Sequence, residues 1–290
     1  MATLRLATRR SAQAMAQSRA VAERIEADHP GVSVELVTVE TLGDRRTDVP
    51  LHSIGGQGVF VKEVQRAVLD GAADLAVHSA KDLPSIGTDG LSIVAFCARR
   101  DPADALIGAR LDDLAPGATI ATGSVRRRAQ LRAVRPDLQF VELRGNIQTR
   151  LAQIPPDGAI VMAVAALQIL GLTDRIAEVL PVESFVPAPG QGCVAVECRG
   201  DDHITAAFVA TVDDRATRAA VEVERVFLGE LGTGCSLPVG AHAAGDALHA
   251  FLARDEVVAL RTVTLPEAPT DRAAVARSLA ASMRADVGDV

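Results

Sequence analysis

The fold is decided by residues 4–39, which read LRLATRRSAQAMAQSRAVAERIEADHPGVSVELVTV. Residues 4–8 alternate apolar and polar side chains as a strand does. Ser11 is a typical helix cap and predicts a helix over 12–27. Residues 32–39 are rich in β-branched side chains and predict a second strand. A strand, a helix and a strand in this order indicate an α/β fold with a largely parallel sheet.

The same alternation continues along the chain. After the first unit we expect a helix over 59–69 and strands over 74–78 and 91–97. The Asp101-Pro102 step suggests a crossing into a second α/β unit. That unit is predicted to contain strands over 118–121, 138–143 and 158–161 and helices over 124–134 and 147–154.

A return to the first unit is predicted near the proline-rich Pro187-Ala188-Pro189-Gly190, because a strand over 193–198 could rejoin the first sheet. Two crossings of this kind would create a hinged cleft. The remaining residues predict a smaller domain with helices over 215–231 and 270–285 and strands over 248–253 and 257–264. The predicted domains are residues 1–98 with 193–212, residues 99–192, and residues 213–290.

Composition narrows the classes of function. A net charge of -7 disfavours a general nucleic-acid binder, and with 2% aromatic residues and no Trp or Tyr there are few stacking surfaces. The four cysteines form no C-x-x-C pair, which disfavours zinc ribbons and redox dithiols. Cys193 and Cys198 are expected to face opposite ways without a mutual disulfide, as in a reducing compartment. The apolar run 159–172 is too short to span a membrane and indicates core.

The strongest oddity is Thr122-Gly123-Ser124-Val125-Arg126-Arg127-Arg128, where a strand turns into a helix whose first turn holds three arginines. Cations at this end oppose the helix dipole, at a cost of about 0.3–1 kcal/mol for each charge. A bound anion, such as a carboxylate or phosphate, would resolve the conflict. The alternative is a solvated basic face continued by Arg132 and Arg135. The anion site is the favoured interpretation.

Two more strand ends carry arginine. Arg144-Gly145-Asn146 is followed by Arg150, and Thr8-Arg9-Arg10-Ser11 ends the first strand. Alone, each cluster suggests only exposed surface arginines. Because the carboxyl ends of parallel strands face one crevice, the three clusters together predict an arginine-lined cleft for a polycarboxylated molecule.

Two further segments have candidate chemistry. His78-Ser79-Ala80-Lys81-Asp82-Leu83-Pro84 places a cation and a carboxylate at a strand end, although an exposed turn with an ordinary ion pair is an equally good interpretation. His78 itself indicates a buried, hydrogen-bonded histidine. Gly232-Thr233-Gly234-Cys235 places a thiol in a loop, where either reactivity or ordinary packing is open. Gly55-Gly56-Gln57-Gly58 lacks the residues of a phosphate loop and suggests a mobile lid or hinge.

Taken together, these segments resemble hydroxymethylbilane synthases, also called porphobilinogen deaminases. The segments that carry the resemblance are LATRRS (6–11), GGQGVFVKE (55–63), DLAVHSAKDLPS (74–85), ATGSVRRRAQL (121–131), LRGNIQTRL (143–151), PAPGQGCVAVECR (187–199) and GTGCSLPVGA (232–241). Departures from the common pattern include Gln57 and Ser53 in place of basic residues, Gln168-Ile169 where a basic residue is common, and Gly123 in place of serine.

The resemblance implies two lobes like type II periplasmic binding proteins with a hinged cleft, plus a smaller α+β domain. It implies a transferase that condenses porphobilinogen head to tail with release of ammonia, then hydrolyses off linear hydroxymethylbilane, in tetrapyrrole (heme) biosynthesis. It further implies a dipyrromethane cofactor joined by thioether to Cys235, and no metal or nucleotide. The expected protein is a cytoplasmic monomer with no nucleic-acid or membrane partner.

The resemblance also assigns roles by motif position. Asp82 is the catalytic carboxylate, which would steady the cationic azafulvene left when ammonia departs. Cofactor contacts are expected from Lys81, Asp82, Thr122, Ser124, Arg126, Arg127, Arg144 and Gly145. Substrate contacts are expected from Arg9, Ser11, Arg144, Arg150 and Gln191. A non-catalytic anion-binding protein, or a relative that binds the cofactor without elongating it, are the alternatives.

Overall fold

The computed structural model describes residues 2–41, 58, 60–232 and 237–288. Its first sheet has the order β2-β1-β3-β10-β4. β1 is parallel to β2 and β3, and β10 is antiparallel to both of its neighbours. The strand bounds are β1 Ala2–Arg9, β2 Val32–Val39, β3 Leu75–Ser79, β4 Leu91–Phe96 and β10 Val194–Arg199.

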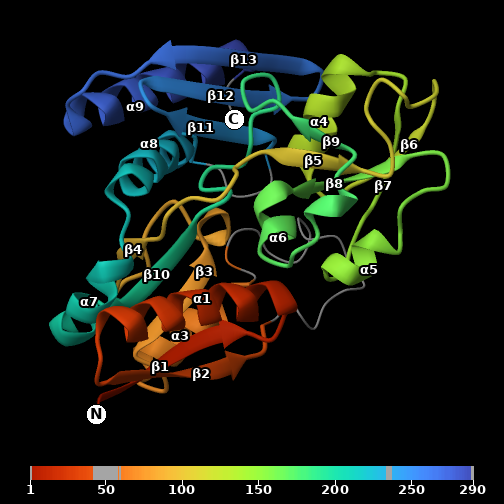
Figure 1. The fold of residues 1–290 in the computed structure, drawn as a ribbon. Coiled ribbons are helices and arrows are strands. Elements are labelled where there is room, and N and C mark those ends of the chain that lie inside the picture. Colours follow the sequence, from red (N-terminus) through yellow and green to blue (C-terminus); the bar gives the residue numbers. More distant parts are fainter. Residues whose placement is uncertain (1, 42–57, 59, 233–236, 289–290) are drawn as a thin grey trace.

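The second sheet repeats this plan with the order β7-β6-β8-β5-β9. Its antiparallel strand is β5, which occupies the place that β10 has in the first sheet. The bounds are β5 Asp104–Ile107, β6 Thr119–Ala121, β7 Gln139–Val141, β8 Ala159–Ala163 and β9 Glu178–Leu180. The chain therefore crosses from β4 to β5 and returns from β9 to β10, so two connecting segments run between the sheets (Figure 1).

Helices cover both faces of each of these sheets, and we call each sheet with its helices a lobe. In the first lobe, α1 (Ala12–Asp28) and α7 (His203–Val209) pack on one face and α3 (Lys62–Leu69) on the other. In the second lobe, α4 (Val125–Val134) packs on one face and α5 (Ile147–Leu151) and α6 (Val164–Gln168) on the other. Short 3-10 turns are η2 Ala80–Asp82, η3 Thr173–Arg175 and η4 Ala210–Val212.

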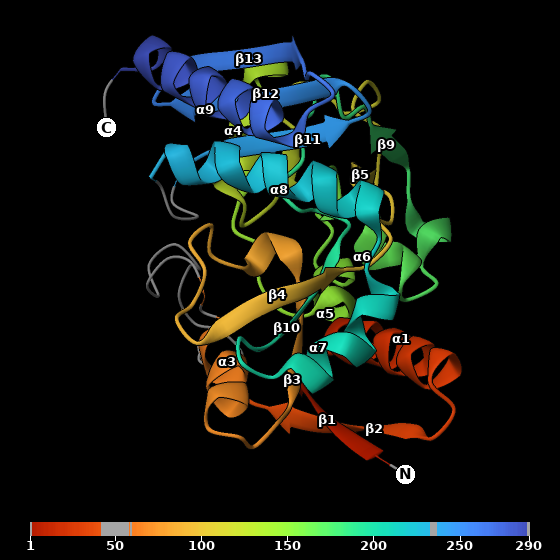
Figure 2. The same ribbon diagram turned by 90° about the vertical axis from the view of Figure 1, so that its left-hand side faces the viewer.

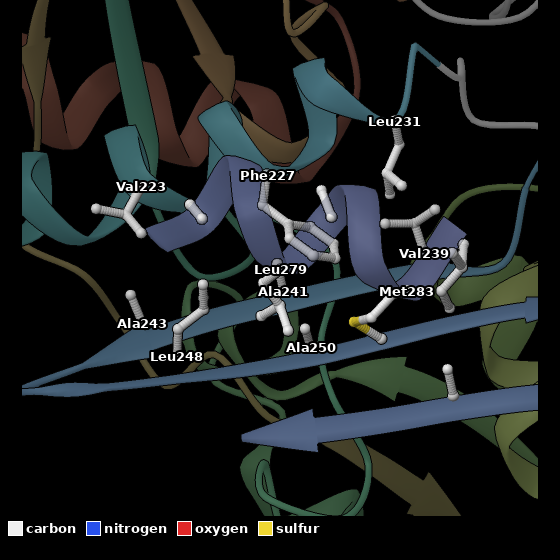
Figure 3. Packing of buried hydrophobic residues seen from close by; sticks show 14 of the residues in the cluster. Val223, Phe227, Leu231, Val239, Ala241, Ala243, Leu248, Ala250, Leu279 and Met283 are labelled. Atoms are coloured by element: carbon white, nitrogen blue, oxygen red, sulfur yellow. The ribbon is translucent and has the colours of Figure 1, made fainter. Parts of the chain in front are cut away.

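The third sheet, β11-β12-β13, is antiparallel and lies at the end of the molecule opposite β1 and β2 (Figures 1 and 2). Its strands are β11 Val239–Ala244, β12 Ala247–Arg254 and β13 Val257–Thr264, and its helices are α8 Arg215–Glu230 and α9 Pro269–Asp286. Figure 3 shows the core between the helices and one face of the sheet, where Phe227, Leu248 and Met283 meet. The other face packs against the second lobe, because Phe251 and Ala253 share a cluster with Ala129 of α4 and with Val186.

The predicted fold class is confirmed, with two α/β lobes and a smaller α+β unit. Several elements agree closely with the sequence: the cap at Ser11, the strand β2, and the return of β10 to the first sheet. β5, β9, β11 and α6 were not predicted, because each is short and has no periodic pattern of its own. The domain boundaries stay a prediction, and most of the expected glycine loop, residues 55–57, lies outside the described residues.

Two smaller expectations are confirmed. Cys193 and Cys198 are free thiols that belong to different core clusters. The predicted burial of His78 is also confirmed, with Nε2 3.2 Å from the carboxylate of Glu197, whereas its hydrogen bond stays a prediction. Of the helices within the described ranges, none combines the length and the apolar character that a membrane span requires.

One buried carboxylate ties the connecting segments to the third sheet. Glu224, on α8, is fully buried and accepts bonds from both Nη atoms of Arg99, at 2.6 and 3.1 Å. It also accepts from the backbone N–H of Gly190 at 2.7 Å and of Ala243 at 2.8 Å. Arg99 follows β4, Gly190 precedes β10 and Ala243 lies in β11, so a single side chain joins all three regions.

We expect Glu224→Gln to lower the free energy of unfolding by about 3–5 kcal/mol, because it removes the buried charge that compensates Arg99, whose side chain is 11% exposed. Urea denaturation would measure the loss. Glu222→Gln is the matched control on the same helix, since the Glu222 side chain is 56% exposed and lies 3.3 Å from Arg218. Equal losses in the two variants would contradict this account of Glu224.

Candidate active site

The predicted strand ends converge in the structure. β1 ends at Arg9, and β3 runs into the 3-10 turn η2, which carries Lys81 and Asp82. The charges of Arg9, Asp82, Arg127 and Arg144 all act on the guanidinium of Arg150, although these residues come from both lobes. The strand tips therefore face one region, as the sequence predicted.

Arg126 and Arg127 lie at the start of α4 and hold a carboxylate that the sequence analysis missed. Asp104, in β5, is fully buried. Its Oδ2 accepts from Nη2 of Arg126 at 2.8 Å, and its Oδ1 accepts from Nη2 of Arg127 at 2.6 Å. Burial alone would raise the pKa of Asp104, but the two guanidiniums outweigh it and hold the pKa well below its usual range.

The anion expected at this helix start is thus partly supplied by the protein. The solvated-face alternative is wrong for Arg126 and Arg127, which are only 5% and 8% exposed, although it fits exposed Arg132. Asp104 lies three residues after Asp101, in an unpredicted four-residue strand. Its only signal in the sequence is a single acid inside the apolar run Ala103–Ile107.

Asp104 compensates only part of the positive charge of the two arginines. Arg126 also donates to the carbonyl of Val186 at 2.7 Å, and Arg127 donates to the carbonyl of Val161 at 3.0 Å. These carbonyls carry no net charge, and one carboxylate neutralises only one of two guanidiniums. A net positive charge remains at the start of α4, where further carboxylates could bind.

Gln191 connects this cluster with the first lobe. Its Oε1 accepts from Nζ of Lys81 at 3.1 Å, and its Nε2 donates to Oδ1 of Asp104 and to the carbonyl of Pro102, both at 2.8 Å. Gln191 is 1% exposed. The described contacts of Gln191 are therefore with protein groups, and its predicted contact with substrate stays a prediction.

Lys81 is held among charges of both signs, those of Arg126, Arg127, Asp82 and Asp104. Burial and the charge of Arg127 lower the pKa of Lys81 to about 8, while Asp82 and Asp104 oppose the shift. An ammonium whose pKa is depressed in this way would be stabilised by any added anion. Lys81 also lines a small pocket between the lobes, together with Gln17 of α1 and Ala166 of α6.

Arg150 and Arg144 lie at the end of the second sheet. Arg150 donates from Nε to the carbonyl of Gly145 at 2.8 Å. Burial and the charges of Arg127 and Arg144 lower the pKa of Arg150 to about 10. Gly145 has φ of 106°, and a Cβ there would lie 2.7 Å from Cγ2 of Thr149, so only glycine fits this turn.

The predicted hydroxyl groups have structural partners. Thr122 Oγ1 accepts from the N–H of Ser124 at 3.2 Å, and Ser124 Oγ caps α4 by accepting from the N–H of Arg127 at 3.4 Å. A Cβ at Gly123 would lie 2.9 Å from the carbonyl oxygen of Leu143, which explains why serine is absent there. These hydroxyls shape the turn that presents the arginines, and their contact with a cofactor stays a prediction.

Arg9 and Ser11 complete the first-lobe side. The guanidinium of Arg9 stacks 4.0 Å from the ring centroid of Phe60, and Ser11 Oγ caps α1 by accepting from Ala14 N–H at 3.3 Å. Cys235 lies outside the described residues. Within the ranges that the structure covers, no group of three or more His, Cys, Asp or Glu side chains is arranged to hold a metal ion.

Two family models match most of the chain. The model described as "Porphobilinogen deaminase, dipyromethane cofactor binding domain" matches residues 4–207, and "Porphobilinogen deaminase, C-terminal domain" matches residues 218–285. The chain belongs to the porphobilinogen deaminase family. The match to the cofactor-binding domain confirms the predicted dipyrromethane cofactor.

Curated relatives from several bacteria bear the name porphobilinogen deaminase. That of Stenotrophomonas maltophilia (strain K279a) is 48% identical over 256 residues, which cover 86% of this chain and 84% of the relative. That of Syntrophus aciditrophicus (strain SB) is 45% identical over 253 residues, covering 84% and 82%. Among solved structures, the methionine binding protein MetQ has a TM-score of 0.46 and 15% identity, over 74% of this chain and 92% of that chain.

We expect Lys81 to lose its proton near pH 8 in protein without cofactor, because burial and Arg127 disfavour the charged amine. The measurement is the pH dependence of acetylation at Lys81, followed by peptide mass spectrometry. The exposed Lys62 is an internal reference for reagent decay. The rate at Lys81 should level off above about pH 8, and a rate still rising steeply between about pH 9 and 10 would contradict the shift.

Proposed function

We propose that this chain condenses porphobilinogen units head to tail, with release of one ammonia at each step, and then hydrolyses off linear hydroxymethylbilane. The observation that carries the proposal is the hydrogen-bonded path from Lys81 through Gln191 to Asp104 and Arg127, in a chain that belongs to the porphobilinogen deaminase family. The charge of Asp82 acts on both Lys81 and Arg150. The reaction is a step of tetrapyrrole (heme) biosynthesis.

The charge of the site suits such a substrate. Each pyrrole ring carries an acetate and a propionate, so the growing chain accumulates carboxylates that must leave water together. Guanidiniums present paired N–H donors that match carboxylates in geometry and charge. We assign this role to Arg9, Arg126, Arg127, Arg144 and Arg150, with Lys81, Thr122, Ser124, Ser11, Gly145 and Gln191 as further contacts.

We assign to Asp82 the stabilisation of a positive charge. When ammonia leaves porphobilinogen, the remaining pyrrole is cationic, and a fixed carboxylate stabilises this cation better than water can. The turn η2 holds Asp82 in place, because its neighbours Ala80 and Leu83 are each 2% exposed. The N–H of Ala80 also donates to the carbonyl of Cys193 at 2.9 Å, which ties the turn to β10.

When bound, the dipyrromethane supplies the primer on which the chain grows. Its carboxylates fit the cluster chemically, since buried guanidiniums with only one carboxylate between them can accept more anions. We assign its thioether attachment to Cys235, by position in the GTGCSLPVGA motif. Of the other cysteines, Cys193 and Cys198 are buried, and burial raises the pKa of both thiols, which disfavours the reactive thiolate.

We further propose that the protein acts as a monomer in the cytoplasm, without a nucleic-acid partner. The free thiols of Cys97, Cys193 and Cys198 suit a reducing compartment. The net charge of -7 disfavours binding to phosphate backbones.

We expect the purified protein to carry a covalent two-ring adduct on Cys235. Mass spectrometry of the denatured protein and of its peptides would locate it. Cys235→Ser should abolish the adduct, whereas the control Cys97→Ser should keep it, because Cys97, just after β4, lies in none of the segments that carry the family resemblance. A wild-type mass equal to that of the bare chain, even after incubation with porphobilinogen, would overturn the proposal.

Asp82→Asn should retain the adduct but lower turnover by at least about 100-fold, because it removes the carboxylate charge with little change in shape. Turnover is measured as ammonia release and as porphyrin formed after oxidation of the product. Asp89→Asn, an exposed change in the loop that follows, should leave turnover unchanged. Near-normal product formation by Asp82→Asn would refute the catalytic role.

A further inference from the structure

Asp104 occupies the place between two guanidiniums where a guest carboxylate was expected. It is fully buried, and its carboxylate accepts from Arg126, from Arg127 and from Gln191 at 2.6–3.1 Å. It comes from β5, the strand of the second sheet that follows the connection between the lobes, rather than from α4 itself. Asp104 lies outside every segment that carries the family resemblance.

We infer that Asp104 is the resident counter-ion of the cofactor site, which positions Arg126 and Arg127 and compensates their charge while guest carboxylates are absent. The inference rests on the proposed function, because it assumes that the guest is a polycarboxylate bound at these arginines. Asp104 is then a positioning residue. The stabilisation that the bound cofactor gives to the protein should depend on whether the Asp104 charge is present.

The balance of charge supports this role. Lys81, Arg126 and Arg127 are the cations that act on Asp104, and they exceed the carboxylate that lies between them. Removal of Asp104 would leave buried guanidiniums without a counter-charge, which is strongly destabilising. A dipyrromethane with several carboxylates would restore negative charge at the same place.

A purely structural role for Asp104 makes a different prediction. If Asp104 only held β5 to α4, its loss would destabilise the protein equally with and without the adduct. If Asp104 and the guest compensate the same guanidiniums, the adduct must offset part of the loss, because a group that binds the folded state stabilises it according to its affinity. The two roles therefore differ in how far the adduct raises the melting temperature.

The test compares Asp104→Asn with wild-type protein, each made in cells that cannot produce porphobilinogen and then incubated with porphobilinogen. Adduct formation is read by mass, and melting temperature by calorimetry before and after. The adduct should raise the melting temperature of Asp104→Asn by about twice as much as that of the wild type. Equal gains would overturn the inference.

Asp137→Asn is the matched control. Asp137 also accepts two bonds from one arginine of the second lobe, Arg135, both at 2.8 Å, but at the far end of α4. Adduct formation should raise the melting temperature of Asp137→Asn by the same amount as that of the wild type. A rise twice as large would show that the loss of any ion pair has the effect expected for Asp104→Asn. If wild-type protein formed no adduct, the proposed function would fail before Asp104 was tested.

Where Asp104→Asn does not fold without the guest, the double variant Asp104→Asn with Arg126→Met provides the test. The double variant lacks one charge of each sign, so it should fold. The adduct should raise its melting temperature by no more than it raises that of the wild type. A pair that still failed to fold, with and without porphobilinogen, would overturn the inference, because charge compensation would not explain the defect.

Discussion

The structure depends on a line of buried charged and polar groups that runs through the two segments connecting the lobes. Glu224 accepts from Arg99, Arg99 donates from Nε to the carbonyl of Gln191 at 2.9 Å, and Gln191 donates to Asp104. Buried carboxylates are tolerable only when their partners are present and well oriented. The line therefore constrains how the two lobes and the third sheet are placed relative to one another.

The same constraint places the chemistry. Gln191 reaches Lys81 in the first lobe and Asp104 in the second, so the groups that compensate the arginines and the turn that carries Asp82 belong to one network. A site built where two lobes meet brings together side chains from several strand ends. It also lies where the dielectric constant is low, so that a fixed carboxylate acts strongly on a nearby cation.

The sequence predicted the general arrangement because strong local patterns set it. Ser11 caps a helix as expected, and parallel strand ends gather the arginines. Asp104 and Glu224 were missed, because their roles arise only from tertiary contacts. Asp104 is one acid in a short strand, and Glu224 looks like an ordinary polar residue of an amphipathic helix. Periodicity reports which face of an element is apolar, and carries no information about which buried charge a distant arginine will meet.

The arginines at the start of α4 illustrate the difference between a structural ion pair and a receptor site. Two guanidiniums that oppose the helix dipole are compensated by Asp104 and by the carbonyls of Val186 and Val161. A purely structural arrangement would balance the charges fully, because excess buried charge costs free energy. Here Lys81 adds another cation, and burial together with the charge of Arg127 lowers its pKa to about 8. The unbalanced positive charge is destabilising in the empty site, and this is the free energy that a polycarboxylate recovers when it binds.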